Sequence, residues 1–271
     1  MESKIAKAIG MSLNPVALIW TNDRPEGASQ FKEGKWGCVM WHFANAAKGK
    51  IAVFDRNTFG CWGGGVGLGF GNQYVKFPGG EECFHYFLST GNKNWEKGRA
   101  VGEGLKPYVS EDFYDEFMEG ERYVKTPEAV KEFVTQLPIV DIPYQFVVFK
   151  PLNQVDPQKE NVIVIAFPVD PHQLVALIVL SNYGRDTFEN VIVPWGAGCQ
   201  SIGILTYREI NKKPQRAVIG MTDLSARKNI RKQLGDNIMT ISMPYEMFLE
   251  LEGYVEGSFL ERPTWRALLG R

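Results

Sequence analysis

The chain has 271 residues, of which 44% are apolar and 13% aromatic, which suits one large domain or two closely packed lobes with a substantial core. Its 30 lysines and arginines against 31 aspartates and glutamates leave a net charge of −1, so nothing global favours nucleic acid or an acidic membrane. The charged N-terminus has no apolar signal core, and prolines and charges interrupt the most apolar stretch, 161–181. We therefore expect a cytoplasmic protein with reduced cysteines and no membrane span.

Helical and strand patterns alternate irregularly along the chain. Period-3.6 patterns and capping residues predict helices over 2–9, 35–48, 81–88, 110–118, 126–137, 172–182 and 244–252. Runs rich in valine and isoleucine predict strands over 15–20, 51–54, 145–149, 161–167, 191–193, 217–221 and 238–242. The sequence therefore predicts an α+β fold, with mixed sheets and packed helices in an irregular α/β sandwich. We expect a single domain over 1–271, or two closely packed lobes of about 1–140 and 141–271.

The most informative local pattern is a cysteine that follows a strand and a glycine. Cys61 comes after the apolar run 51–54 and opens the segment Cys-Trp-Gly-Gly-Gly-Val-Gly-Leu-Gly-Phe-Gly. The pattern recurs at Cys199, after the run 191–193 and before a helix expected from Gln200. A cysteine at a helix start faces unpaired N–H groups and the positive end of the helix dipole. Both favour the thiolate, which binds metals and attacks electrophiles.

The four cysteines, Cys38, Cys61, Cys83 and Cys199, are far apart in the chain and form no C-x-x-C pair. Zinc ribbons, thioredoxin-type pairs and ferredoxin runs are therefore excluded as local motifs, and the fold would have to assemble any site. His42 lies four residues after Cys38 on an expected helix, so both could ligate one centre. A buried histidine with a satisfied hydrogen bond is the favoured interpretation of His42.

The glycine run after Cys61 matches neither the dinucleotide pattern G-x-G-x-x-G nor a phosphate loop. It instead indicates backbone packed closely against another backbone or against a bulky cofactor. The candidate cofactor-binding residues are the glycines beside the two cysteines, Gly60, Gly63, Gly64, Gly65 and Gly198.

The other sequence patterns give less information about catalysis or binding. There is no G-x-S-x-G motif, and no residue is assigned a catalytic role. The stretch 208–232 holds eight basic residues against two acidic ones. It is either a docking face for an acidic partner or anionic ligand, or ordinary solvated surface.

The Cys38 segment, the glycine-rich Cys61 segment and the late Gly-Ala-Gly-Cys together resemble the ArCR family, a domain of unknown function (DUF169). The resemblance runs from about residue 15 to 244. It implies a recurring cysteine set at Cys38, Cys61 and Cys199. Many relatives carry a further Gly-Cys-x-Gly-Cys-Arg-like segment, whereas the matching stretch 220–227 here has an arginine but no cysteine. The family has no settled activity, so the resemblance implies a fold and a cysteine set only.

Two function hypotheses follow. The first is an iron–sulfur or other thiolate-metal protein of redox metabolism, with zinc as the weaker metal. Its ligands would be Cys38, Cys61 and Cys199, with Cys83, His42 or an exogenous group as the fourth. The second is a small-molecule binding protein or non-metal enzyme without a cofactor. In it the cysteines are structural, and the glycine run lines a pocket with Trp36, Trp41, Trp62 and Trp195. The expected partner is a redox protein or a small molecule, and the oligomeric state is left open.

Overall fold

The computed structural model describes residues 1–270 and divides into two compact units. The first combines Met1–Gly71 with the chain from Val140 onward, and the second is Asn72–Ile139. The two ends of the insertion lie side by side, because the Gly71 N–H donates to the Val140 carbonyl at 3.0 Å. The sheet of the first unit takes strands from both parts of the chain that were expected as possible lobes, 1–140 and 141–271.

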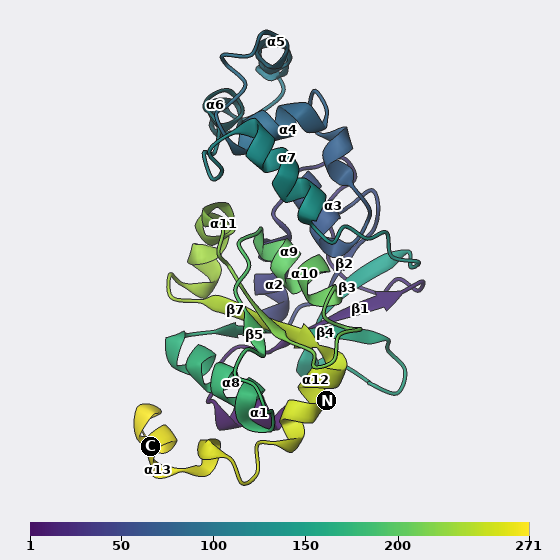
Figure 1. The fold of residues 1–271 in the computed structure, drawn as a ribbon. Helices are drawn as coiled ribbons and strands as arrows, with labels where there is room; N and C mark the ends of the chain where they lie inside the picture. Colours follow the sequence, from purple (N-terminus) through teal and green to yellow (C-terminus); the bar gives the residue numbers. More distant parts are fainter. Residues whose placement is uncertain (271) are drawn as a thin grey trace. The chain divides into compact units, whose positions relative to one another are not determined.

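A seven-stranded sheet forms the centre of the first unit (Figure 1). Its spatial order is β2-β3-β1-β4-β7-β6-β5, and every neighbouring pair is antiparallel except β5 and β6. The strands are β1 (Val16–Thr21), β2 (Ala52–Phe54), β3 (Phe146–Pro151), β4 (Val162–Val169), β5 (Val191–Ile192), β6 (Ala217–Gly220) and β7 (Met239–Pro244). This mixed sheet with packed helices confirms the predicted α+β class.

Helices cover both faces of the sheet (Figure 1). One face packs against α1 (Lys4–Ala8), α8 (Pro171–Tyr183), α12 (Tyr245–Gly253) and α13 (Pro263–Leu268). The other carries α2 (Val39–Ala47), α9 (Gly198–Ile202) and α10 (Ile204–Tyr207). Burial on both sides explains why β4 reads as a continuous apolar run rather than an alternating one.

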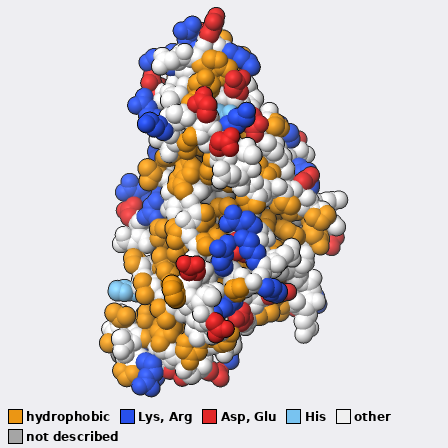
Figure 2. Space-filling view, viewed as in Figure 1, with side chains coloured by type: hydrophobic (Ala, Val, Ile, Leu, Met, Phe, Trp, Pro, Cys, Tyr) orange, Lys and Arg blue, Asp and Glu red, His pale blue; other side chains and the backbone are white. Residues whose placement is uncertain are grey.

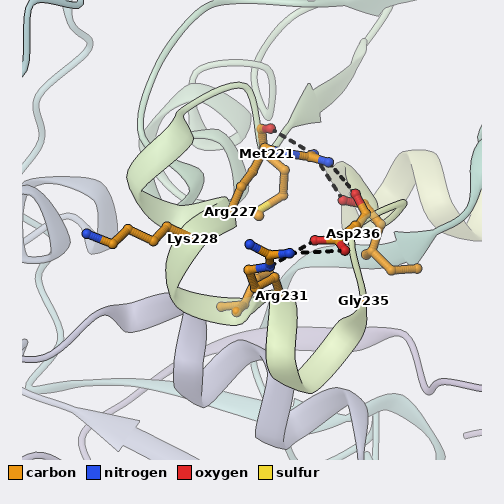
Figure 3. Close-up of a pocket in the computed structure, with 8 residues that line it drawn as sticks. Met221, Arg227, Lys228, Arg231, Gly235 and Asp236 are labelled. Atoms are coloured by element: carbon orange, nitrogen blue, oxygen red, sulfur yellow. Dashed lines mark hydrogen bonds and ion pairs between the residues drawn. The ribbon is translucent and has the colours of Figure 1, made fainter.

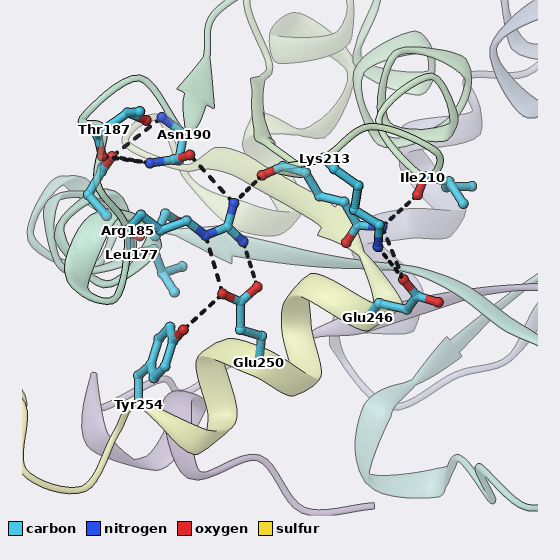
Figure 4. Close-up of polar contacts among 12 residues, drawn as sticks. Leu177, Arg185, Thr187, Asn190, Ile210, Lys213, Glu246, Glu250 and Tyr254 are labelled. Atoms are coloured by element: carbon cyan, nitrogen blue, oxygen red, sulfur yellow. Dashed lines mark hydrogen bonds and ion pairs between the residues drawn. The ribbon is translucent and has the colours of Figure 1, made fainter.

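An ion pair after the end of α8 connects three elements (Figure 4). The Arg185 guanidinium donates to both carboxylate oxygens of Glu250 on α12, at 3.2 and 2.5 Å, and to the Gln215 carbonyl at 2.7 Å. The Tyr254 hydroxyl also donates to Glu250. Arg185 is 9% exposed, so these contacts hold a nearly buried charge with its donors satisfied and make the cluster structural.

The second unit is helical with an aromatic core. Its elements are η1 (Gln73–Lys76), α4 (Glu81–Leu88), α5 (Glu96–Leu105), α6 (Glu111–Glu119) and α7 (Pro127–Gln136). Ser110 and Thr126 cap α6 and α7 as the sequence predicts, each accepting a backbone N–H. The sequence missed α5, because its glycines weaken the helical signal. Two of them are needed for close packing, since a Cβ on Gly98 would meet Trp95 and one on Gly102 would meet Met118.

Across residues 1–270, none of the helices combines the length and apolar character needed to cross a membrane.

Candidate functional site

Cys38 is the N-cap of α2 rather than part of the helix interior. The expected helix from 35 begins only at Val39, and Cys38 has the extended backbone of a capping residue (φ −81°, ψ 123°). His42 lies one turn further on and points into the core. Its ring packs edge-on against Phe31 and Phe54, its Nδ1 lies 3.3 Å from the Ser29 hydroxyl, and burial lowers its pKa. These contacts fit the favoured interpretation of His42 as a buried, hydrogen-bonded histidine.

Cys61 is also an N-cap, at the start of α3 (Trp62–Leu68). Its Sγ accepts the Gly64 N–H at 3.2 Å, and its own N–H donates to the Gly37 carbonyl at 3.1 Å. Gly60, with φ +80°, makes this approach feasible, because a Cβ there would overlap the Gly37 carbonyl oxygen. The backbone of Cys61 therefore lies against the residue that precedes Cys38.

The glycine run forms the tightly packed helix α3, which lies against α9. A Cβ on Gly67 would stand 2.8 Å from the Cys199 carbonyl carbon, so only glycine allows the two backbones this close. Cys199 is buried in the first turn of α9, and its Sγ donates to the Gly63 carbonyl at 3.2 Å. The packing of α3 against α9 thus places Cys199 beside the first turn of α3, the helix that Cys61 caps. Gly65, another of the glycines predicted to bind a cofactor, donates its N–H to the Cys61 carbonyl at the start of α3.

Asp223 is a site residue that sequence reasoning missed. It is the buried N-cap of α11 (Leu224–Leu234), a helix that was also not predicted. One carboxylate oxygen accepts the Ala226 N–H and the other accepts the Gly198 N–H, both at 2.5 Å. Asp223 therefore ties the start of α11 to the start of the Cys199 helix. An aspartate just before Leu-Ser-Ala-Arg is an N-cap signal. The stretch 208–232 was instead interpreted from its eight basic residues, as a charged surface.

Cys38, Cys61, Cys199 and Asp223 form one electrostatic group, here called the Cys–Asp cluster. Burial, followed by the charges of Cys61 and Asp223, raises the pKa of Cys38 to about 12. Burial also raises the pKa of Cys199 well above its ordinary value, and the charges of all three other members add to the effect. The pKa of Asp223 is raised by burial, against hydrogen bonds from Ala226 and Gly198. The fold thus brings three distant cysteines within electrostatic range of one another.

The Cys–Asp cluster is not preformed for a single metal ion. Within residues 1–270, no three histidine, cysteine, aspartate or glutamate side chains are placed to hold one ion. A tetrahedral zinc needs each thiolate sulfur about 2.3 Å from the metal, so its ligand sulfurs stand about 4 Å apart. The geometry therefore gives no support to a mononuclear zinc or iron site.

The family model for DUF169, described as uncharacterised ArCR, matches residues 4–253. The chain belongs to the DUF169 family. The resemblance inferred from the cysteine segments is thereby confirmed. Neither the curated proteins nor the solved structures contain a match to the chain. Because the DUF169 description carries no activity, the function has to be argued from the site.

The fourth cysteine of this DUF169 protein belongs to the other unit. Cys83 lies on α4 within Asn72–Ile139, where its buried Sγ packs so closely on Gly79 that a Cβ there would overlap it. Burial raises its pKa, with smaller effects from the charges of Lys97 and Glu82. Its surroundings within that unit are those of a packing thiol. A ligand role for Cys83 stays a prediction.

A small pocket lies beside α11, and its basic residues are largely engaged (Figure 3). Arg227 donates to the carbonyls of Met221, Ile238 and Asp236, while Arg231 pairs with the Asp236 carboxylate at 3.1 Å. Lys228 extends away from these contacts (Figure 3). The volume, about 140 Å³, is below that of usual ligand pockets. These contacts join β6, α11 and β7 and do not form a binding site.

Three further basic residues of the stretch are paired within the DUF169 chain. Glu209 is completely buried, and Arg208, Lys212 and Arg216 all form ion pairs with its carboxylate. Basic side chains gather near the middle of the face shown in Figure 2, with apolar and acidic side chains around them. These basic side chains therefore have acidic partners within the chain itself, and a docking role for 208–232 stays a prediction.

Proposed function

We propose that the Cys–Asp cluster is the site of a polynuclear iron–sulfur centre used in redox chemistry, with Cys38, Cys61 and Cys199 as its thiolate ligands. The observation that carries the proposal is the convergence of these three thiols from distant segments. The charge of Cys61 acts on the pKa of both other cysteines, and the charge of Cys38 acts on that of Cys199. Such a centre supplies one-electron transfer when bound.

A polynuclear centre places different demands on its thiolate ligands than a single metal ion does. In a 4Fe–4S centre each thiolate binds a different iron, so the ligand sulfurs stand further apart than around one metal. The support for a shared centre is the electrostatic interaction among the three thiols.

The protonation of the thiols gives metal binding a measurable consequence. Three thiolates beside Asp223 would be four negative charges at a partly buried place. The metal-free protein avoids that cost by keeping Cys38 and Cys199 as thiols, as their raised pKa values indicate. Bound metal cations would stabilise the thiolates, so binding should release protons.

The chain's own backbone groups would orient the ligands. Cys61 accepts the Gly64 N–H, and Asp223 fixes the start of the Cys199 helix by accepting the Gly198 N–H. Backbone N–H groups aimed at ligand sulfurs stabilise thiolates and tune a redox potential. Three protein ligands leave one position for an exogenous ligand, a substrate or a fourth side chain.

The alternative with a tryptophan-lined pocket has weaker support. Trp36 packs edge-on against Trp41, and the Trp41 indole N–H donates to the Asn229 carbonyl at 3.0 Å. At least these two of the four tryptophans therefore pack against protein groups.

The test is anaerobic purification and reconstitution with iron and sulfide, followed by absorption spectroscopy and iron and sulfide analysis. We expect a broad band near roughly 400 nm with matched iron and sulfide. Cys38→Ser, Cys61→Ser and Cys199→Ser should each lose most of the iron. Cys83→Ser, the matched control, should retain it. A colourless wild-type protein that takes up no iron would overturn the proposal, and loss of iron in Cys83→Ser would make Cys83 the fourth ligand.

A further inference from the structure

The backbones of Cys38 and Cys61 are neighbours, and the charge of Cys61 acts on Cys38. The Cys61 N–H donates to the carbonyl of Gly37, the residue bonded to Cys38, at 3.1 Å. Gly60 and Gly37 keep this approach open, because a Cβ on Gly60 would overlap the Gly37 carbonyl oxygen and one on Gly37 would overlap the Phe31 ring. The sequence therefore places glycine directly before each of the two cysteines, where the segments meet.

This hydrogen bond limits the distance between the two cysteine backbones. Standard peptide dimensions put the Cα of Cys38 about 3 Å from the Gly37 oxygen and the Cα of Cys61 about 1.5 Å from its own nitrogen. With the 3.1 Å hydrogen bond between them, the two Cα atoms stand at most about 7.6 Å apart at full extension, and the bent donor and acceptor angles of a hydrogen bond bring them closer than that limit. Disulfides join Cα atoms about 4.4–6.8 Å apart, so the pair lies in or near the range that a disulfide spans.

The two thiols also share an accessible position. Cys38 and Cys61 are both half-buried helix N-caps in extended conformation, whereas Cys199 is buried inside the first turn of its helix. A small oxidant can therefore reach this pair more readily than Cys199.

We propose that Cys38 and Cys61 form a reversible disulfide in the metal-free protein, with a hydroperoxide as the oxidant. The Cys61 thiolate attacks one peroxide oxygen, the O–O bond breaks, and the departing hydroxide takes a proton to become water. The Cys38 sulfur then attacks the Cys61 sulfenic acid, the S–O bond breaks, and the hydroxide leaves as water with the Cys38 proton. Two thiols lose two electrons, and hydrogen peroxide is reduced to two waters.

The disulfide has a consequence for the site that rests on the proposed function. It would remove two of the three thiolates, so the oxidised protein would not take up iron. A dithiol reductant would restore both thiols and with them the ability to bind. The pair would then act as a redox switch on the occupancy of the site.

The experiment uses the full chain, reduced and freed of metal with a chelator, then treated with hydrogen peroxide. Remaining thiols are blocked with N-ethylmaleimide, and peptides are mapped by mass spectrometry without reduction. We expect free thiols to fall from four to two, a linked Cys38–Cys61 peptide two hydrogens lighter than its parts, and full reversal by dithiothreitol. Cys83→Ser should form the same link, and Cys38→Ser should not.

Two outcomes would overturn the proposal. One is a link that joins Cys199 or Cys83 in place of the pair. The other is Cys61 oxidised to sulfinic acid with no link, in protein whose circular dichroism is native. Because the assay contains no iron, its result stands apart from that of the iron reconstitution. A disulfide without iron binding, or the reverse, would separate the two proposals.

Discussion

At the scale of single residues, the metal-free protein holds Cys38 as a thiol. Burial and the charges of Cys61 and Asp223 raise its pKa from an ordinary value of 9.0 to about 12. A thiol with a raised pKa keeps its proton at neutral pH and loses it only as the pH approaches the raised value. The thiolate is the form that attacks alkylating reagents, so the raised pKa controls the reactivity of Cys38.

The first prediction is that iodoacetamide alkylates native Cys38 at least about thirty times more slowly at pH 8 than the same cysteine in urea. A shift of about three pKa units lowers the thiolate fraction roughly a thousandfold, and the higher nucleophilicity of the more basic thiolate recovers part of that. The rate should climb steadily up to pH 10, where an ordinary thiol has already levelled off. Peptide mapping of timed samples measures it, and equal rates in both states would contradict the assigned environment.

Residue-scale reasoning from the sequence succeeded where local chemistry is strong. Cys61 was expected at a helix start because a strand, a glycine and a glycine-rich segment frame it, and the structure places it at an N-cap. Asp223 was missed, because its role depends on the Gly198 N–H from a segment distant in sequence. Cys38 was expected inside a helix, and the apolar period of that helix does not distinguish its first residue from its cap.

At the scale of elements, the bounds of long amphipathic helices were predicted well, whereas α5 and α11 were missed and α3 was expected only from the cysteine that precedes it. The helix α4 was predicted with its observed bounds, and α8 to within a residue, because apolar spacing and capping residues mark them. By contrast α3, with the sequence Trp-Gly-Gly-Gly-Val-Gly-Leu, has almost no intrinsic helix preference. Its helix exists because its glycines allow α9 to lie close against it.

The close packing of α3 against α9 at Gly67 predicts the effect of Gly67→Ala. The new Cβ would stand 2.8 Å from the Cys199 carbonyl carbon and 2.9 Å from its Sγ, so α3 and α9 must move apart. We expect a loss of about 1–3 kcal/mol in the free energy of unfolding, measured by urea denaturation. Gly253→Ala is the control, because no atom lies within 4 Å of a Cβ there. It should be neutral or up to about 1 kcal/mol more stable. Equal effects at both positions would contradict the close packing.

At the scale of the whole molecule, the sequence predicted the class of fold but not its arrangement. The strand order β2-β3-β1-β4-β7-β6-β5 depends on pairings between distant segments, which no local pattern reports. The same holds for the site, whose cysteines come from segments on both sides of the inserted unit. Spacing along the chain could identify the thiols as candidates, but only the packing of α2, α3, α9 and α11 shows that three of them share one place.

The insertion itself permits a prediction about the whole chain. The first unit closes at the junction, where Phe70 and Asp141 form an antiparallel bridge, the Gly71 N–H donates to Val140, and the Ile142 N–H donates to the Gly69 carbonyl at 2.8 Å. Two antiparallel segments this close can be joined by a short turn. We therefore expect a chain in which a Gly-Ser-Gly linker replaces residues 72–139 to fold, with one cooperative transition in urea.

The shortened chain also tests which unit supplies the ligands of the proposed iron–sulfur centre. It retains Cys38, Cys61, Cys199 and Asp223 but lacks Cys83, so we expect it to take up as much iron per chain as the full-length protein under the same reconstitution. The same deletion combined with Cys61→Ser is the control and should lose the iron. If the shortened chain unfolds cooperatively yet binds no iron while the full chain does, the inserted unit must supply a ligand, and Cys83 becomes the first residue to examine.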